Sequence, residues 1–150
     1  VSENIDAVEF GAHPFVLHTS GGARITTDAV IVATGARANW LGLHNEERLA
    51  RSGGGVSSCA VCDGALPAFR EQRLVVVGGG DSAMEEALYL TKFASEVVIV
   101  HRRDSFRASK VMADRVLQHP KVKVEWNAAV VDVLGDDFIT GVRVRDTRDG

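Results

Sequence analysis

Apolar and polar residues alternate at the start of the chain, and this two-residue period indicates short β-strands. Residues 6–10 and 14–19 alternate around Gly11-Ala12-His13 and predict a hairpin, and residues 23–27 predict a third short strand. The apolar run at 29–33 is continuous, as is typical of a strand that is buried on both faces. We therefore expect a small antiparallel sheet that leads into one buried strand.

Small and polar residues dominate positions 36–58, which predicts a connector rather than a core element. Within it, Gly53-Gly54-Gly55 permits backbone conformations that other residues avoid. Such a run is typical of a surface loop or of a hinge between domains. The sequence leaves both interpretations open.

Short apolar runs alternate with helical periodicity from Leu74 onward. The expected elements are a buried strand at 74–77, a helix at 82–93, a strand at 97–100, a helix at 107–119 ended by Pro120, and strands at 122–126, 130–134 and 139–145. The first helix is expected to turn Ala83, Ala87, Leu88 and Leu90 inward. Strand, helix, strand, helix, strand is the order of a parallel nucleotide-binding sheet, so the predicted class is α/β, a Rossmann-like three-layer fold.

A glycine motif, Gly78-x-Gly80-x-x-Ala83, joins the predicted strand to the predicted helix. Gly78 permits the tight turn, Gly80 lets a diphosphate approach the backbone, and Ala83 is small enough for close helix packing. The diphosphate would lie at the helix N-terminus, where free N–H groups favour negative charge. Ser82 is the expected side-chain donor, whereas Asp81 would repel the diphosphate unless its carboxylate points away.

Basic residues follow the second parallel strand, where a site for NAD would place a carboxylate. The positions read His101-Arg102-Arg103, with Arg107 one turn later. Guanidinium groups suit a ribose 2′-phosphate, so the sequence predicts NADPH rather than NADH. The alternative is an exposed basic start of a helix without a ligand.

Composition narrows the choice of function. The 150 residues are 45% hydrophobic and carry a formal net charge of −3, which argues against a nucleic-acid-binding protein. No apolar run approaches the ~18–20 residues of a membrane span. The 2 cysteines both lie in Cys59-x-x-Cys62, too few for a disulfide scaffold or a zinc site, so we expect a redox-active pair and no metal.

Asp63 follows the second cysteine directly and is placed to protonate a leaving thiolate; a helix cap or a turn with Gly64 is the structural alternative. Nicotinamide delivers a hydride and a disulfide accepts electrons through thiolates, so a flavin is expected between them. Residues 57–150 offer no second nucleotide motif for it.

These motifs together resemble the low-molecular-weight thioredoxin reductases of bacteria and plants. The resemblance rests on Ala33-Thr34-Gly35, residues 58–64 around the dithiol, residues 77–87 around the glycine motif, and residues 101–108 around the arginines. It extends over nearly the whole chain.

The resemblance implies a homodimer in which a domain for NADPH is inserted into a domain for FAD. Residues 1–46 would be the end of a first FAD segment, and residues 47–150 most of the NADPH domain with its dithiol. Thr34 and Gly35 would lie near FAD. Cys62 would face the flavin, Cys59 would attack the disulfide of thioredoxin, and Asp63 would be the acid.

For the nucleotide, the resemblance implies that Gly78, Gly80, Ser82 and Ala83 hold the diphosphate and that Arg102, Arg103 and Arg107 hold the 2′-phosphate. Asp81 and His101 are also among the candidate cofactor-binding residues. Family members rotate one domain against the other. We also expect a cytoplasmic protein, although a sequence that opens at Val1 rather than methionine gives no information on targeting.

The expected fold is incomplete, because the family begins with its own FAD motif and ends with a further FAD segment. A chain of this extent is expected to lack stable FAD and turnover by itself. Two alternatives stay open: a flavoprotein of the same layout that reduces peroxiredoxins, and a module that binds NADP or senses redox state without catalysis.

Overall fold

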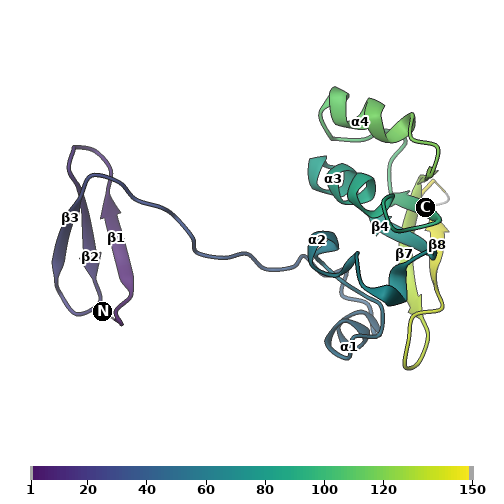
Figure 1. Cartoon of the computed structure of the whole chain (residues 1–150), viewed down its shortest axis with the longest axis horizontal. Helices are drawn as coiled ribbons and strands as arrows, with labels where there is room; N and C mark the ends of the chain where they lie inside the picture. The colour runs from purple at the N-terminus through teal and green to yellow at the C-terminus, as the bar shows by residue number, and fades with distance from the viewer. Residues whose placement is uncertain (1, 149–150) are drawn as a thin grey trace. The chain divides into compact units, whose positions relative to one another are not determined.

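The computed structural model describes residues 2–148, which fall into two compact units, one ending at Arg37 and the other beginning at Ala38. The first unit is a three-stranded sheet and the second contains all the helices (Figure 1). The domain boundary predicted after residue 46 follows from the family resemblance and stays a prediction.

The first unit is an antiparallel meander of β1 (Ile5–Glu9), β2 (Phe15–Thr19) and β3 (Arg24–Thr27), in that order across the sheet. This confirms the predicted hairpin and third strand. Val16 and Thr19 are its buried residues. The Thr19 hydroxyl accepts a hydrogen bond from the Ala23 N–H at 3.0 Å and thereby holds the turn between β2 and β3.

The strand predicted at 29–33 is wrong for this chain. These residues have no regular secondary structure, and Ile31 and Val32 are 92% and 71% exposed. A strand needs a hydrogen-bonded neighbour, and no strand of residues 2–148 pairs with this segment. The apolar composition of residues 29–33 favours a β-strand, but composition alone does not form one without a partner strand.

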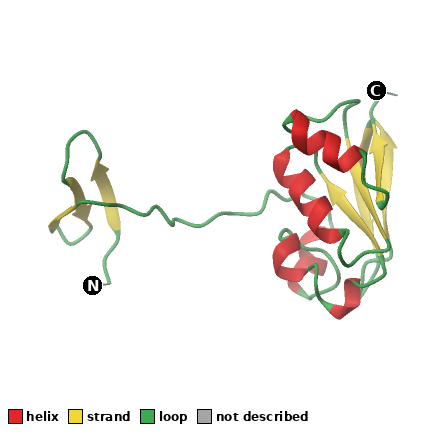
Figure 2. Ribbon diagram, turned by 45° about the horizontal axis from the view of Figure 1, so that its top comes forward, coloured by secondary structure: helices red, strands yellow, loops and turns green. Residues whose placement is uncertain are grey.

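The second unit is built on a parallel sheet of β4 (Arg73–Val77), β5 (Glu96–His101) and β6 (Val122–Trp126), in that order. Helices α3 (Asp81–Leu90) and α4 (Lys110–Leu117) pack on one side of it, and the antiparallel pair β7 (Ala128–Leu134) and β8 (Gly141–Asp146) lies on the other (Figure 2). This arrangement confirms the predicted three-layer, Rossmann-like α/β class.

The core of this unit lies between α3 and the sheet. The inward face of α3 consists of Ala83, Met84, Ala87 and Leu90, with Leu88 partly buried beside it, as predicted except for Met84. Their partners are mainly Val97, Ile99 and Val116, all fully buried. β4 was predicted to be a buried strand, but it lies at an edge of the sheet, so Val75 and Val77 are exposed.

Both helices are shorter than predicted, and one boundary of each moves by three residues. α3 ends at Leu90 rather than at residue 93, where the chain turns toward β5. α4 begins at Lys110 rather than at residue 107, because the Arg107 and Ala108 N–H groups donate to the Gly79 carbonyl, at 2.7 and 3.1 Å, instead of entering a helix.

The connector predicted at 36–58 contains one short helix, α1 (Glu46–Arg51). Two more short helices, α2 (Ala60–Asp63) and the 3₁₀ helix Pro67–Phe69, follow it before β4. Between α1 and α2, Gly54 is buried, and a Cβ there would lie 2.6 Å from Leu49 Cδ2. The Gly54 carbonyl accepts from the Ile139 N–H at 2.8 Å. The glycine run is therefore a packed loop, which favours the loop interpretation over the hinge.

An ion-pair cluster joins the three parallel strands at one end. The carboxylate of Glu96 on β5 pairs with Arg73 of β4 at 2.7 Å and with Lys123 of β6. The Lys123 ammonium, followed by Arg73, holds the pKa of the Glu96 carboxyl below its usual range. A carboxyl whose pKa is lowered by folding stabilises the fold above its unfolded-state pKa and loses this contribution as the pH falls through the folded-state value.

We therefore expect Glu96→Gln to lower the free energy of unfolding at pH 7 and to have a shrinking effect as the pH falls to about 3. Urea titrations across this range measure the difference. The control is Glu85→Gln, which removes an exposed carboxylate without an ion pair to residues 2–148. A Glu96→Gln deficit that is equal at both pH values would contradict the ion-pair explanation.

Candidate functional site

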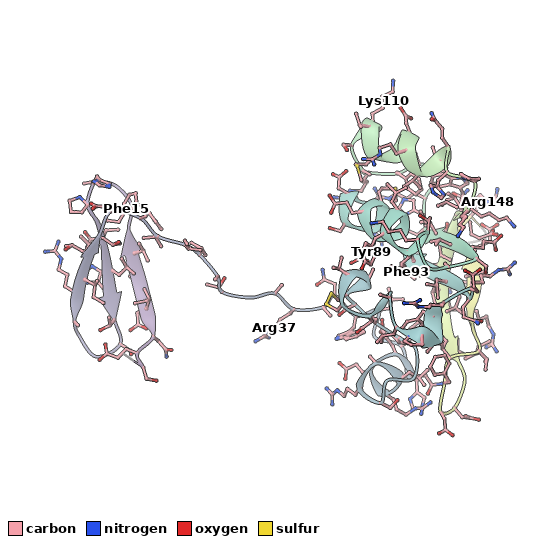
Figure 3. All side chains as sticks on the ribbon, in the orientation of Figure 1. Phe15, Arg37, Tyr89, Phe93, Lys110 and Arg148 are labelled. Atoms are coloured by element: carbon pink, nitrogen blue, oxygen red, sulfur yellow. A yellow bond between two sulfur atoms is a disulfide. The ribbon has the colours of Figure 1, made fainter. Side chains whose placement is uncertain are left out.

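Cys59 and Cys62 form a disulfide at the start of helix α2, with their Cα atoms 5.3 Å apart (Figure 3). Cys59 is the N-cap residue of α2, and its Sγ accepts a hydrogen bond from the Cys62 N–H at 3.3 Å. A donor aimed at sulfur favours the thiolate form once the disulfide is reduced. This hydrogen bond is therefore expected to stabilise the thiolate of Cys59 more than that of Cys62.

Ser57 is a site residue that the sequence reasoning missed. Its hydroxyl lies 2.6 Å from Asp63 Oδ2 and 3.3 Å from the Cys59 carbonyl, and its single proton goes to the shorter contact. The same oxygen accepts from the Cys59 N–H at 3.0 Å. Ser57 therefore joins the predicted acid to the first cysteine. A serine two positions before the cysteine was the only signal for this role.

Gly64 holds the dithiol turn, residues 59–64, against the C-terminal end of α3. A Cβ at Gly64 would lie 2.6 Å from Leu90 Cδ2 and 2.6 Å from the Ala60 carbonyl oxygen. Only glycine therefore fits this contact without a shift of α2 or α3. The glycine that follows Cys-x-x-Cys-Asp is explained by this packing.

The glycine loop, residues 78–80, joins β4 to the N-terminus of α3. Gly78 has φ +150°, and a Cβ there would be 2.9 Å from the Cβ of Ala83, which is the close approach of strand and helix that the motif predicted. Gly80 is the N-cap residue and provides no side-chain cap, and the first intrahelical bond runs from Met84 N to Gly80 O at 3.2 Å. The N–H groups before it are left for a ligand.

Open space surrounds Gly80, where no heavy atom lies within 4 Å of an added Cβ. An uncapped helix N-terminus beside an open glycine is the cradle that a diphosphate requires. Ser82 is exposed in the first turn of α3. The residues present therefore fit a dinucleotide.

His101 lies beneath the glycine loop, with 6% of its surface exposed. Its ring packs against Gly79 so closely that a Cβ there would overlap it, and Nε2 is 2.9 Å from the Ser105 carbonyl. Phe106 and Trp126 flank the ring. This surrounding gives His101 a structural role in supporting the loop; its contact with the nucleotide stays a prediction.

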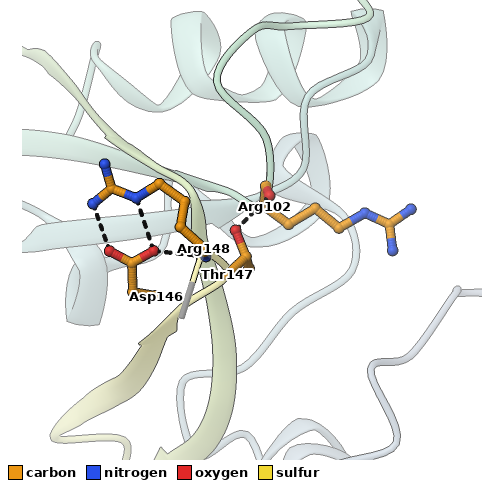
Figure 4. Close-up of polar contacts among 4 residues, drawn as sticks. All are labelled: Arg102, Asp146, Thr147 and Arg148. Atoms are coloured by element: carbon orange, nitrogen blue, oxygen red, sulfur yellow. Dashed lines mark hydrogen bonds and ion pairs between the residues drawn. The ribbon is translucent and has the colours of Figure 1, made fainter. Parts of the chain in front are cut away.

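The predicted arginines lie together on one exposed segment, the arginine loop, residues 102–107. Its backbone is held at both ends: the Thr147 hydroxyl donates to the Arg102 carbonyl at 2.9 Å (Figure 4), and the Arg107 N–H donates to Gly79. Within residues 2–148, the guanidinium groups of Arg102, Arg103 and Arg107 form no ion pair. Arg148 differs, because it pairs with Asp146 at 2.6 Å and lowers the pKa of that carboxyl to about 2.

Thr34 and Gly35 are exposed and belong to the first unit, whereas the other candidates belong to the second. Gly35 has φ +80°, a left-handed conformation that glycine adopts without strain. In the described part of the chain, no helix combines the length and apolar character needed to cross a bilayer. The same residues contain no group of three or more His, Cys, Asp or Glu side chains arranged to hold a metal ion.

A parallel sheet with an open glycine loop, a free arginine cluster and a Cys-x-x-Cys disulfide on one unit defines a dinucleotide-binding protein with a dithiol. Comparison with known families agrees with this class. The chain belongs to the pyridine nucleotide-disulphide oxidoreductase family, whose model matches residues 1–149.

Individual relatives cover the same range. Thioredoxin reductase 1, mitochondrial, of Arabidopsis thaliana is 49% identical over 99% of this chain and 41% of its own length. A thioredoxin reductase of Rickettsia prowazekii is 42% identical over 97% of this chain and 47% of its own. The structure of a thioredoxin reductase from Giardia duodenalis superimposes with a TM-score of 0.79 and 37% identity, over 100% of this chain and 48% of that one. The chain thus spans less than half the length of these relatives.

Two alanine substitutions in the glycine loop should have different effects. Gly79→Ala should lower the free energy of unfolding by about 1–3 kcal/mol, because the added methyl group displaces His101. Gly80→Ala should change it by no more than about 0.5 kcal/mol, yet weaken ADP binding by about tenfold, the cost of forcing a methyl group into the diphosphate contact.

Urea unfolding and calorimetric titration with ADP measure the two effects in both variants. Gly80→Ala that binds ADP like the wild type would contradict the diphosphate cradle. Gly79→Ala that unfolds like the wild type would contradict the tight His101 contact.

Proposed function

We propose that this protein is a flavoprotein thioredoxin-disulfide reductase, which passes electrons from NADPH through FAD to the Cys59–Cys62 pair and on to thioredoxin. The observation that carries the proposal is the presence of the disulfide and the nucleotide cradle on one α/β unit, bound to the two ends of α3. The relatives described above are thioredoxin reductases, which supports the same activity, and those proteins are longer than this chain.

NADPH is the proposed electron donor. The uncapped N-terminus of α3 and the open Gly80 would receive its diphosphate, and the arginine loop would receive its 2′-phosphate. The support is that three exposed guanidinium groups stand on one segment without ion pairs to the described residues. A phosphate with two negative charges gives each of them a partner.

FAD is the proposed mediator, since a flavin accepts a hydride and releases electrons to a disulfide. Thr34 and Gly35 are proposed to lie near it on the grounds of family resemblance. The dimer and the cytoplasmic location expected from the resemblance are likewise proposals.

The contacts of the dithiol turn support the following proposed chemistry. In the reduced state the Cys59 thiolate, supported by the Cys62 N–H, attacks one sulfur of the thioredoxin disulfide and forms a mixed disulfide. The released thioredoxin thiolate takes up a proton, which Asp63 supplies. The Cys62 thiolate then attacks Cys59 Sγ, which re-forms the Cys59–Cys62 disulfide and releases reduced thioredoxin.

The test for this function uses the full-length protein and its Cys59→Ser variant. Wild-type protein should show a flavin spectrum and NADPH-dependent reduction of thioredoxin. Cys59→Ser should lose thioredoxin reduction by at least about a thousandfold, as expected when a nucleophile is removed. It should retain reduction of its flavin by NADPH.

Ser58→Ala, which leaves both sulfurs in place, is the matched control and should keep its activity. A flavoprotein that NADPH reduces but that is inactive with thioredoxin would favour the peroxiredoxin-reducing alternative. A full-length protein without flavin would leave only the nucleotide-binding module.

Nucleotide preference can be tested at the arginine loop. Arg102→Ala should weaken NADPH binding about ten- to a hundredfold, because it removes one charge-assisted contact to the 2′-phosphate. NADH binding should hardly change. Arg115→Ala, which removes an exposed arginine of α4 outside the cluster, is the control. Equal losses for NADPH and NADH in Arg102→Ala would contradict 2′-phosphate recognition.

A further inference from the structure

We propose that Asp81 is a positioning residue that fastens the arginine loop to the glycine loop, and that it thereby sets the preference for a nucleotide with a 2′-phosphate without touching that phosphate. The proposal rests on the proposed use of NADPH. It deepens that function by assigning a role to a carboxylate that the sequence alone could not reconcile with a diphosphate site.

The contacts of Asp81 point to the second helix of the unit. Asp81 Oδ1 accepts hydrogen bonds from the Ser109 N–H at 2.8 Å and from the Ser109 hydroxyl at 2.9 Å. Ser109 is the N-cap residue of α4, and its own side chain does not cap that helix. The carboxylate of one helix start thus binds the residue that begins the other. This contact gives the carboxylate hydrogen-bond donors at the start of α4, although its negative charge remains near the N-terminus of α3.

The hydrogen bonds to Ser109 lie next to backbone hydrogen bonds that join the same two segments. The Gly79 carbonyl accepts from the Arg107 and Ala108 N–H groups, at 2.7 and 3.1 Å. Asp81 lies two residues after Gly79, and Ser109 lies two residues after Arg107. The C-terminal end of the arginine loop is therefore tied to the glycine loop at successive points, and the side chains among these ties are those of Asp81 and Ser109.

These hydrogen bonds affect the preference between NADPH and NADH because the arginine side chains are exposed and long. Ordering such a side chain or its backbone on binding costs free energy, and a loop already held in place reduces that cost. NADPH would receive this advantage through its 2′-phosphate. NADH lacks that group, so its binding does not depend on the order of the arginine loop.

The charge of Asp81 has a separate and opposite effect. A carboxylate near the N-terminus of α3 disfavours any diphosphate, whether it belongs to NADPH or to NADH. Removing it therefore favours both nucleotides alike, whereas loosening the arginine loop affects only the phosphorylated one. The ratio of the two affinities isolates the positioning effect.

The experiment measures NADP⁺ and NAD⁺ binding to the full-length protein by calorimetry, for wild type, Asp81→Ala and Asp81→Asn. Asp81→Ala should lower the ratio of NADP⁺ to NAD⁺ affinity about three- to tenfold, the range for hydrogen bonds open to solvent. Asp81→Asn keeps an oxygen acceptor for Ser109 and should retain the ratio within about twofold, which separates the hydrogen bond from the charge.

Two further variants complete the test. Ser109→Ala loses the hydroxyl contact but keeps its N–H, so it should give a smaller decrease in the ratio and serves where Asp81→Ala does not fold. Asp104→Ala removes a carboxylate of the arginine loop that contacts only the Ser105 hydroxyl within residues 2–148, and it should not lower the ratio.

The outcomes are distinguishable. A wild-type protein without preference for NADP⁺ would overturn the proposed use of NADPH and this inference with it. A wild-type preference that Asp81→Ala retains would overturn only the positioning role. A decrease that Asp81→Asn shares in full would also overturn it, because the acceptor would then be irrelevant.

Discussion

The close contact between helix α3 and the parallel sheet is the constraint on which both parts of the candidate site depend. Gly78 and Ala83 meet at the N-terminal end of the helix, where an added Cβ would be 2.9 Å from its neighbour. Met84 and Ala87 are fully buried along its middle. At the other end Leu90 leaves room for Gly64 and nothing larger. The helix, roughly 15 Å long, thus packs against the glycine loop at one end and against the dithiol turn at the other.

Charged side chains of this protein fall into two groups, those that form ion pairs and those that do not. Glu96 pairs with cations on both neighbouring strands and contributes to the fold, whereas Asp146 pairs with Arg148, two residues away in the sequence. The backbone of the arginine loop is held by hydrogen bonds, and its arginine side chains form no ion pair with the described residues. Their positive charges therefore remain available to a ligand. Three such guanidinium groups on one segment suit an anionic ligand, whereas the paired carboxylate of Glu96 has a structural role.

The sequence predicted most of the second unit because its information there is local. The alternation of apolar runs and helical periods located every strand of that unit, and the glycine motif located the N-terminus of α3 within one residue. The misses have non-local causes. The extended segment 29–33 has strand-like composition but no partner strand among the described residues, and the delayed start of α4 depends on a carbonyl at Gly79 that no periodicity reveals. Ser57 and its bond to Asp63 were invisible for the same reason.

The three consecutive glycines show most clearly how tertiary contacts change the meaning of a sequence pattern. Gly54 is buried between Leu49 and the chain at Asp137, so it is glycine because nothing larger fits. The turn before α1 is held as well, since the buried Glu46 carboxylate accepts from the Leu41 and Gly42 N–H groups, both at 2.8 Å. Residues from Leu41 onward are thereby tied to the second unit. A rotation of one domain against the other, as the family resemblance implies, would therefore have to take up its change of backbone angles before Leu41 and not in the glycine run.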